Sequence, residues 1–287
     1  MRKRKGIILA GGAGSRLYPL TLAISKQLLP IYNKPMIYYP LSTLMLSGIR
    51  EILIISQNHF IPLYKSLLGD GSALGLSISY KSQNIPGGIA EAFIIGEDFI
   101  GQDPVALILG DNIFYGSELS LQLPKFSNKN HNTLFSCKVN NPSQFGVVKY
   151  DKKIPISIIE KPKIAPSSDV VTGLYFYDHD VTKIAKSLKK SSRGELEITD
   201  INNHYISKEK TEIYKLSRET LWLDTGTFEN LQECSQIVYS IEKNTHVMIG
   251  CIEEIAFQKG WIDKSSIKKI SSQMGKNEYS NYLMSLE

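Results

Sequence analysis

The segment Lys5–Pro30 reads KGIILAGGAGSRLYPLTLAISKQLLP, and its first half decides the fold prediction. Residues Gly6 to Leu9 are typical of a short buried strand, and the small residues Ala10 to Ser15 then predict a loop. A glycine-rich loop after a strand lets backbone N–H groups approach an anion that side chains would otherwise block. Arg16 can bind phosphate oxygens with two N–H groups, and Lys26 adds a point charge. The segment therefore indicates a site for the phosphates of a nucleotide.

Two better-known glycine loops do not match this segment. The dinucleotide-binding pattern G-x-G-x-x-G fits Gly12 and Gly14, but Leu17 stands at its third position. A Walker-type loop ends in Gly-Lys followed by Ser or Thr, and that ending is missing from the segment. The alternatives are a tight strand-to-helix turn without a ligand and a solvated pair of basic residues. Arg16 and Lys26 together favour phosphate binding.

Short apolar runs alternate with helical patterns through the first half of the chain, as in βαβ units around a mostly parallel sheet. We expect strands over residues 6–9, 51–56, 76–80 and 105–109, and helices over residues 36–47, 60–68 and 88–99. Crossovers of this kind are right-handed, so a doubly wound α/β fold follows. Ligands of such sheets bind beyond the carboxyl ends of the strands. That rule predicts that the loop at Gly11 and the residue Asp111 lie at the same edge.

The second half has a different pattern, in which β-rich segments precede a mainly helical end. We expect strands over 133–139, 146–150, 155–159, 170–177 and 211–216, with helices over 181–188, 199–207, 227–243, 253–259 and 263–272. These strands should complete the sheet, and no clean linker marks a boundary within the chain.

Composition narrows the class of protein. The 287 residues are 42% hydrophobic, which supports a sizeable core, and the net charge of +5 is mild. We see no basic stripe that would indicate nucleic-acid binding and no apolar run long enough to span a membrane. The three cysteines, Cys137, Cys234 and Cys251, fit no metal-binding spacing. They favour a reducing compartment, so the cytoplasm is the expected location.

An ordered series of motifs resembles the sugar-1-phosphate nucleotidylyltransferases. The series comprises GGAGSRLYPLT at 11–21, LLGDGS at 67–72, LGDNIFYG at 109–116, EKP at 160–162, VTGLYFYD at 171–178, RGELEITD at 193–200 and WLDTGT at 222–227. The similarity extends over nearly the whole chain and is strongest to members that use dTTP and glucose 1-phosphate. It implies a nucleotidyltransferase domain over 1–240, with a nucleotide-binding part to about 130 and a sugar-binding lobe at 131–226. Residues 241–287 then form a helical extension.

The resemblance implies phosphoryl transfer, in which dTTP and glucose 1-phosphate give dTDP-glucose and pyrophosphate. Positioning, cations and a metal do most of the work in such reactions. Mg²⁺ prefers oxygen ligands, commonly one or two carboxylates with phosphate oxygens. The resemblance implies Asp111 and Asp224 as the metal ligands and Arg16, Lys26 and Lys161 as further catalytic groups. For either aspartate, the alternative is a residue that caps a turn.

The resemblance also implies the residues of two binding sites. The nucleotide site comprises Gly11, Gly12, Ala13, Gly14, Ser15, Arg16, Gln83, Gly88 and Asp111. The sugar-phosphate site comprises Asn112, Gly146, Glu160, Lys161, Val171, Gly173 and Arg193. Gln83 presents both a donor and an acceptor to the base, and Gly88 allows close approach of the backbone.

Three positions depart from the pattern of the family. Gly87 stands where relatives usually carry Asp or a similar residue, Glu91 where they carry Gln, and Phe145 where they carry Tyr. These departures put the substrate preference in doubt, so UTP or another sugar 1-phosphate is the alternative, and a non-catalytic sensor is a second one. The resemblance further implies a homotetramer and feedback inhibition by dTDP-rhamnose, the product of a deoxysugar route that begins with this step.

Overall fold

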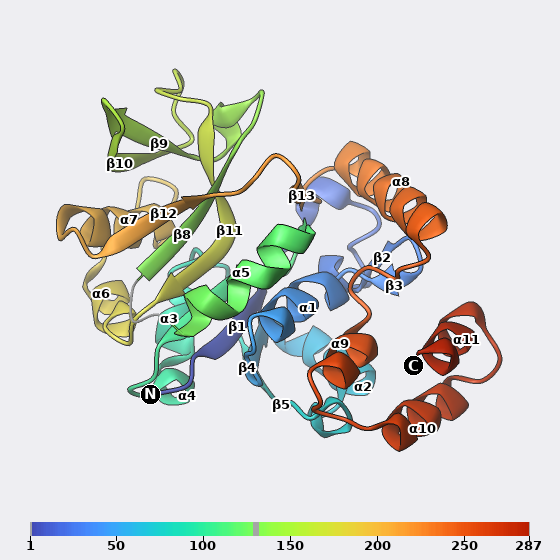
Figure 1. Ribbon diagram of the computed structural model, residues 1–287. Helices are drawn as coiled ribbons and strands as arrows, with labels where there is room; N and C mark the ends of the chain where they lie inside the picture. Colours follow the sequence, from blue (N-terminus) through green and yellow to red (C-terminus); the bar gives the residue numbers. More distant parts are fainter. Residues whose placement is uncertain (1, 129–131, 287) are drawn as a thin grey trace.

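Strand β1 (Lys5–Ala10) lies at the centre of the sheet in the computed structural model, which describes residues 2–128 and 132–286. It pairs in parallel with β4 (Glu51–Ser56) and β6 (Val105–Leu109), and β4 pairs in parallel with β5 (Ser77–Ser82) (Figure 1). Helices α1 (Tyr38–Leu46), α2 (Ile61–Leu68), α3 (Glu91–Ile95) and α4 (Glu97–Ile100) connect these strands. The α/β class with a parallel sheet in the first half is thereby confirmed.

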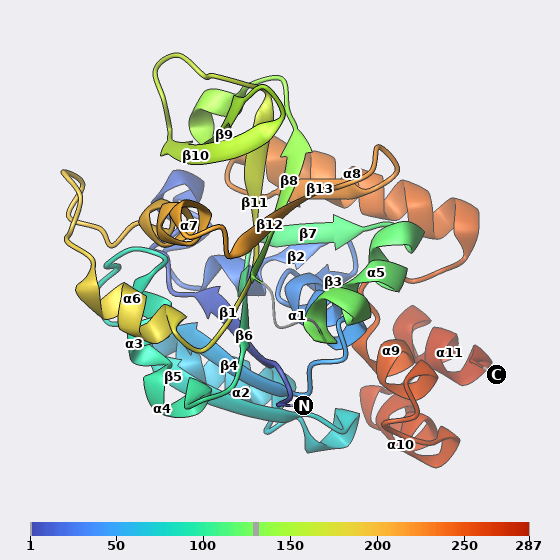
Figure 2. The same ribbon diagram turned by 60° about the vertical axis from the view of Figure 1, so that its left-hand side comes forward.

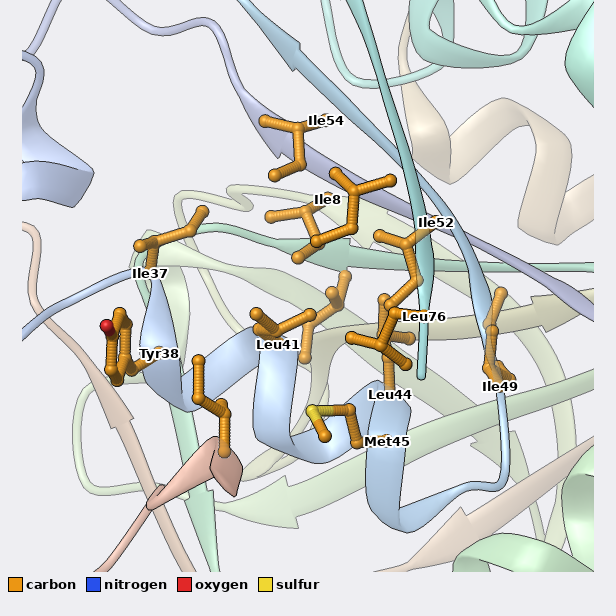
Figure 3. Close-up of a cluster of buried hydrophobic side chains, with 14 of the residues drawn as sticks. Ile8, Ile37, Tyr38, Leu41, Leu44, Met45, Ile49, Ile52, Ile54 and Leu76 are labelled. Atoms are coloured by element: carbon orange, nitrogen blue, oxygen red, sulfur yellow. The ribbon is translucent and has the colours of Figure 1, made fainter. Parts of the chain in front are cut away.

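The parallel strands are buried on both faces, which is why their sequences are continuous apolar runs. Ile8, Ile52 and Ile54 point toward α1, where Leu41 and Leu44 cover them (Figure 3). Alternate residues of the same strands face the opposite layer, which contains α3, α6 (Val181–Ser187) and α7 (Ile198–Ser207). The side-chain period of two therefore divides one sheet between two cores.

The second half of the chain adds antiparallel strands to this sheet. Strand β11 (Asp169–Tyr177) pairs antiparallel with β6 and with β8 (Asn132–Lys138), and β12 (Thr211–Lys215) pairs with β8 in parallel. The expected hairpin is confirmed as β9 (Gly146–Asp151) and β10 (Ile154–Glu160), which extends from the sheet as a lobe (Figure 2). The sheet is thus parallel around β1 and antiparallel toward the lobe.

The end of the chain is helical, and its last three helices lie on the far side of the molecule from that lobe (Figure 1). It comprises α8 (Phe228–Thr245), α9 (Ile252–Gln258), α10 (Lys264–Met274) and α11 (Glu278–Ser285), and α9 packs against α1. The boundary expected at residue 240 lies within α8 and stays a prediction. In the described part of the chain, no helix combines the length and the apolar character that crossing a membrane requires.

Several elements differ from the sequence-based expectation. The helix expected over 88–99 is two short helices with Gly96 between them, and an ideal Cβ on Gly96 would lie 2.9 Å from the carbonyl oxygen of Ala92. Four elements were not expected: β7 (Asn112–Tyr115), α5 (Ser117–Asn128), β13 (Leu221–Asp224) and α11. Smaller elements are β2 (Pro30–Ile31), β3 (Lys34–Pro35) and 3₁₀ turns at Ser15–Leu17, Lys26–Leu28, Asn58–Phe60, Ser72–Leu74 and Pro142–Gln144.

Candidate active site

A cavity of about 780 Å³ opens beyond the carboxyl ends of β1 and β6, where the strand rule expects a ligand. Most of the residues predicted for the site line it, although they come from distant segments of the chain. These are Gly12, Ala13, Gly14, Ser15, Arg16, Lys26, Asp111, Asn112, Gly146, Glu160, Lys161, Val171, Gly173, Arg193 and Asp224. The volume is in the range of pockets that hold nucleotide-sized ligands.

Three predicted residues, Gly11, Gln83 and Gly88, are not among the residues that line this cavity. Gln83 is 4% exposed, and an ideal Cβ on Gly11 would lie 2.3 Å from its side-chain oxygen. Gly88 has a φ of +101°, and an ideal Cβ there would lie 2.3 Å from the carbonyl oxygen of Leu196. Position 88 therefore requires glycine, because its φ and the backbone of Leu196 exclude a side chain, whereas a side chain at position 11 would displace the Gln83 amide. The contact of Gly88 with a base stays a prediction.

The glycine loop presents open backbone to the cavity. Gly14 has a φ of +63°, and its carbonyl oxygen accepts a 2.8 Å hydrogen bond from the Thr21 hydroxyl. Gly12 has free space where a side chain would be, since an ideal Cβ meets no atom within 4 Å. Arg16 follows in the 3₁₀ turn. Arg16 Nη1 and Asp224 Oδ1 both lie beside Gly226, since an ideal Cβ on Gly226 would be 3.3 Å from each of them. The loop thus brings a guanidinium and open backbone toward the carboxylates.

Lys26 and Asp111 form a short ion pair, with 2.6 Å between Lys26 Nζ and Asp111 Oδ2. Asn112 Nδ2 donates to the other oxygen of Asp111 at 3.0 Å. Desolvation acts to raise the pKa of Asp111, but the charge of Lys26 and the hydrogen bonds from Lys26 and Asn112 outweigh it and hold that pKa below its ordinary value. Asp111 is therefore a fixed anion at the end of β6.

Asp224 reaches the same place because β13 pairs antiparallel with β7, with Asp224 opposite Asn112. Thr225, which follows β13, is held against Asp111, which follows β6. The N–H and the hydroxyl of Thr225 both donate to the carbonyl oxygen of Asp111, at 3.2 Å and 3.0 Å. Burial and the neighbouring charge of Asp111 raise the pKa of Asp224 to about 6. Two carboxylates that repel each other beside a cavity have the oxygen donors and the excess negative charge that suit a divalent cation. Within residues 2–128 and 132–286, no cluster of three or more His, Cys, Asp or Glu offers a different metal site.

Asn112 holds three strands together at this site. Its Oδ1 accepts hydrogen bonds from Trp222 Nε1 at 2.7 Å and from the N–H of Gly173 at 3.1 Å. An ideal Cβ on Gly173 would lie 2.6 Å from the same oxygen, so a side chain there would displace the Asn112 amide. Trp222 also packs edge-on against Phe145, with 5.3 Å between ring centroids, and both residues line the cavity. Trp222 belongs to the WLDTGT motif, but it was not among the predicted site residues.

The end of the cavity near β10 and α7 carries Glu160, Lys161 and Arg193. Thr199 Oγ1 donates to Glu160 Oε2 at 2.6 Å, and Arg193 Nη2 lies 2.7 Å from Glu197 and 3.4 Å from Glu160. Lys161 has a φ of +41° and keeps 44% of its side-chain exposure, with Nζ 3.9 Å from Glu160. Thr199 and Glu197 lie in the RGELEITD motif, but they were not among the predicted site residues.

This chain is similar to known proteins in sequence and in structure. Residues 5–240 match the family model described as nucleotidyl transferase. A glucose-1-phosphate thymidylyltransferase of Neisseria meningitidis is 50% identical over 98% of this chain and 99% of its own length, and one from Mycobacterium tuberculosis is 48% identical over 98% of both. A solved structure of a candidate glucose-1-phosphate thymidylyltransferase from Bacillus anthracis, in complex with a sucrose, has a TM-score of 0.75 and 42% identity over 82% of this chain and 94% of its own.

These findings define the class of the protein. The chain belongs to the nucleotidyl transferase family, and its mixed α/β sheet is the fold of that family. Among its relatives, those at about half identity over nearly the full chain are glucose-1-phosphate thymidylyltransferases.

Proposed function

We propose that this protein transfers dTMP from dTTP to α-D-glucose 1-phosphate, which gives dTDP-glucose and pyrophosphate, with Mg²⁺ as its cofactor. The observation that carries the proposal is the convergence of Lys26, Asp111 and Asp224 between the glycine loop and Lys161. One end of the cavity offers open backbone for a triphosphate and the other offers polar groups for a sugar phosphate. The names of the most similar relatives support the same pair of substrates.

In this reaction, an oxygen of the sugar phosphate forms a bond to the α-phosphorus of dTTP. The bond from that phosphorus to the bridging oxygen breaks, and pyrophosphate leaves with the electron pair. Two anions must approach each other, so catalysis depends on positioning and on neutralising charge.

The residues of the cavity suit these tasks. Open N–H groups near Gly12 and the guanidinium of Arg16 would hold the triphosphate and stabilise charge on the leaving pyrophosphate. Lys26 is fixed by Asp111 beside the reacting phosphates. Asp111 and Asp224 would hold the Mg²⁺ ion, which supplies charge neutralisation for the phosphate oxygens.

At the other end of the cavity, Lys161 and Glu160 suit glucose 1-phosphate. The ammonium of Lys161 is accessible and would bind the phosphate. Glu160 is fixed by Thr199, and its carboxylate would accept hydrogen bonds from sugar hydroxyls. Val171 and Gly173 also line the cavity, and the N–H of Gly173 donates to Asn112 Oδ1.

The wider setting is part of the same proposal. We propose a homotetramer that works in the cytoplasm, commits glucose 1-phosphate to deoxysugar synthesis and is inhibited by dTDP-rhamnose. Cys137, Cys234 and Cys251 are all free thiols, which suits a reducing compartment.

The test is pyrophosphate release from dTTP and glucose 1-phosphate, with and without Mg²⁺ and with UTP in parallel. Metal-dependent release that favours dTTP is expected. Release only with UTP, or only with another sugar phosphate, would keep the chemistry and refute the substrate assignment. No release with any pair would refute the enzymatic proposal.

A further inference from the structure

One face of the hairpin formed by β9 and β10 is apolar and exposed. β10 is the end strand of the sheet, so it pairs with β9 on one side only, and the hairpin lies at the outside of the lobe (Figure 2). Ile154, Ile156 and Ile159 in β10 are 69%, 46% and 38% exposed. Ile158, in contrast, is buried in the core to which α7 contributes. β10 therefore has one covered face and one open face.

A β-bulge gathers the three exposed isoleucines on the open face. Side chains of a strand alternate between two faces, so an unbroken strand would place Ile154 and Ile156 on the buried face with Ile158. The register of β10 against β9 shifts at Ile156, and the extra residue reverses this order. Ile154 and Ile159 now lie opposite odd-numbered residues of β9, whereas Ile158 lies opposite an even-numbered one. The result is an apolar row along the open face.

Lysines surround this row. Lys149 belongs to the odd-numbered row of β9 and so lies on the same face, and Lys152 and Lys153 form the turn of the hairpin. Lys163 follows shortly after β10. Residues 149–164 contain five lysines and two acidic residues, so this short segment carries +3 of the net charge of +5. The hairpin is therefore the basic end of a mildly charged protein.

The charges of these four lysines are not neutralised by neighbours. The ion pairs close by involve other lysines, since Lys161 lies 3.9 Å from Glu160 and Lys215 lies 2.6 Å from Asp169. In the part of the chain that the structure describes, none joins the four lysines to a carboxylate. Exposed apolar side chains beside unpaired cations indicate an interaction surface. Its partner should be negatively charged and should offer apolar contact.

The edge of β10 does not favour pairing with a further strand. The N–H of Ile158 donates to Asn203 Oδ1 at 2.7 Å, and Asn203 Nδ2 donates to the carbonyl oxygen of Ile158 at 2.9 Å. The amide thus occupies groups that a neighbouring strand would use, and Pro155 in the same strand has no N–H. A second copy of this chain would also bring its own lysines against these lysines. Both hydrogen bonding and charge therefore oppose pairing between copies.

We propose that the open face of the β9–β10 hairpin binds the surface of an anionic lipid bilayer. The isoleucines would enter the boundary between headgroups and acyl chains, and the lysines would contact lipid phosphates. Such binding needs no backbone hydrogen bonds, which suits a strand whose edge is already closed. Nucleic acid fits this face less well, because its interfaces are polar and would leave the isoleucines without apolar partners. The inference concerns a surface and does not rest on the proposed function.

The test is co-sedimentation of the full chain with lipid vesicles. One set of vesicles contains phosphatidylglycerol and phosphatidylcholine in equal parts, and the other contains phosphatidylcholine alone. The protein should sediment with the anionic vesicles at about 0.1 M salt and stay in solution with the neutral ones. Salt at about 1 M should release it, because charges are then screened within a few ångströms.

Two variants test the two components of the face. Lys152→Gln with Lys153→Gln should lower the partition coefficient by about 20- to 30-fold, at about fivefold for each lysine. Ile154→Ser with Ile156→Ser should lower it by about tenfold, because less apolar surface enters the bilayer.

Lys268→Gln with Lys269→Gln is the matched control. This pair makes the same change in net charge on α10, which lies on the far side of the molecule from the lobe (Figure 1). It should change the partition coefficient by less than about twofold. All the substituted side chains are exposed, and none of them lines the active-site cavity. Melting temperatures, and pyrophosphate release without vesicles, should therefore match those of the original protein.

The inference is wrong if the protein stays in solution with anionic vesicles at about 0.1 M salt. It is also wrong if the two lysine pairs lower binding equally, since binding would then follow net charge alone, or if the isoleucine variant binds like the original protein. If the original protein binds no vesicles and the isoleucine variant changes its mass in light scattering, the face is a contact between copies instead. Pyrophosphate release tests the proposed function separately, so either proposal can fail alone.

Discussion

Replacement of Asp224 by asparagine should stabilise the metal-free protein at neutral pH while it removes turnover. The pKa of Asp224 is raised from 3.8 to about 6 by burial and by the charge of Asp111. The folded protein then binds this proton more tightly than the unfolded chain does, so ionisation of Asp224 opposes folding. The penalty is absent below the unfolded pKa, grows as pH rises toward 6, and is fully present above 6.

The structure sets the size of this effect. One pKa unit corresponds to about 1.4 kcal/mol, so the whole shift would give about 3 kcal/mol at pH 7.5. Because the carboxyl group borders the open cavity, water reduces the interaction, and we expect about 2 kcal/mol in the free energy of unfolding. Asparagine has nearly the same shape as aspartate and no charge, so it removes the repulsion with little change in packing.

The assay is urea unfolding of both proteins in a chelating buffer, from pH 4.5 to 8. Asp224→Asn should be more stable at pH 7.5, and the difference should shrink as the pH falls through 6. Added Mg²⁺ should stabilise the original protein more than the variant. A variant that is less stable at pH 7.5, or a difference that grows toward acid pH, would refute the electrostatic reasoning.

Asp111→Asn is the matched contrast, because the two aspartates have opposite pKa shifts. The pKa of Asp111 is lowered, since Lys26 and two hydrogen bonds outweigh its desolvation. Its stabilising contribution is therefore present at neutral pH, and the variant should be less stable there, with Lys26 left without its partner. Turnover should be lost in both variants. If Asp111→Asn kept the original turnover with Mg²⁺, the assignment of the metal site would be wrong.

Three further predictions concern the rest of the site. Lys161→Ala should raise the KM for glucose 1-phosphate about tenfold or more and leave the KM for dTTP nearly unchanged; equal KM values for the sugar phosphate in steady-state kinetics would contradict its role. Trp222→Phe removes the N–H that donates to Asn112 Oδ1, so it should lower the free energy of unfolding in urea by about 1–2 kcal/mol and lower kcat. If both values were unchanged, the hydrogen bond would be dispensable. Gly88→Ala should destabilise the protein by about 2 kcal/mol or more, because its φ and the contact with Leu196 exclude a side chain; a thermal melting temperature equal to that of the original protein would show that the segment can move.

The sequence predicted the central strands well. The predicted bounds of β4 and β6 are the same as the observed ones, and the predicted β1 is one residue shorter at each end than the observed strand. They are buried on both faces, so each is a continuous apolar run that local pattern reveals. The strand rule then predicted that the loop after β1 and Asp111 after β6 lie at one edge, and both line the same cavity.

The pairing of β7 with β13 could not be predicted in this way. The two strands have four residues each and are more than a hundred residues apart, so neither has a pattern of useful length. Their pairing is what brings Asp224 opposite Asn112 and gives Trp222 its hydrogen-bond partner. Asp224 was predicted as a site residue only because the segment around it resembles a family motif. Nothing in that segment indicated the contact with Asn112.

The sequence by itself determined the α/β class, the open glycine loop and the residue types that phosphate chemistry needs, because these depend on local pattern and on side-chain chemistry. Only the tertiary structure decided the charge state and orientation of those residues. The pKa of Asp224 depends on its distance from Asp111, and the orientation of the Asn112 amide depends on the N–H of Trp222. Both are properties of pairs that lie close in space, and the physical reason is that electrostatic and hydrogen-bonding interactions act through distance in the fold, whatever the separation in the chain.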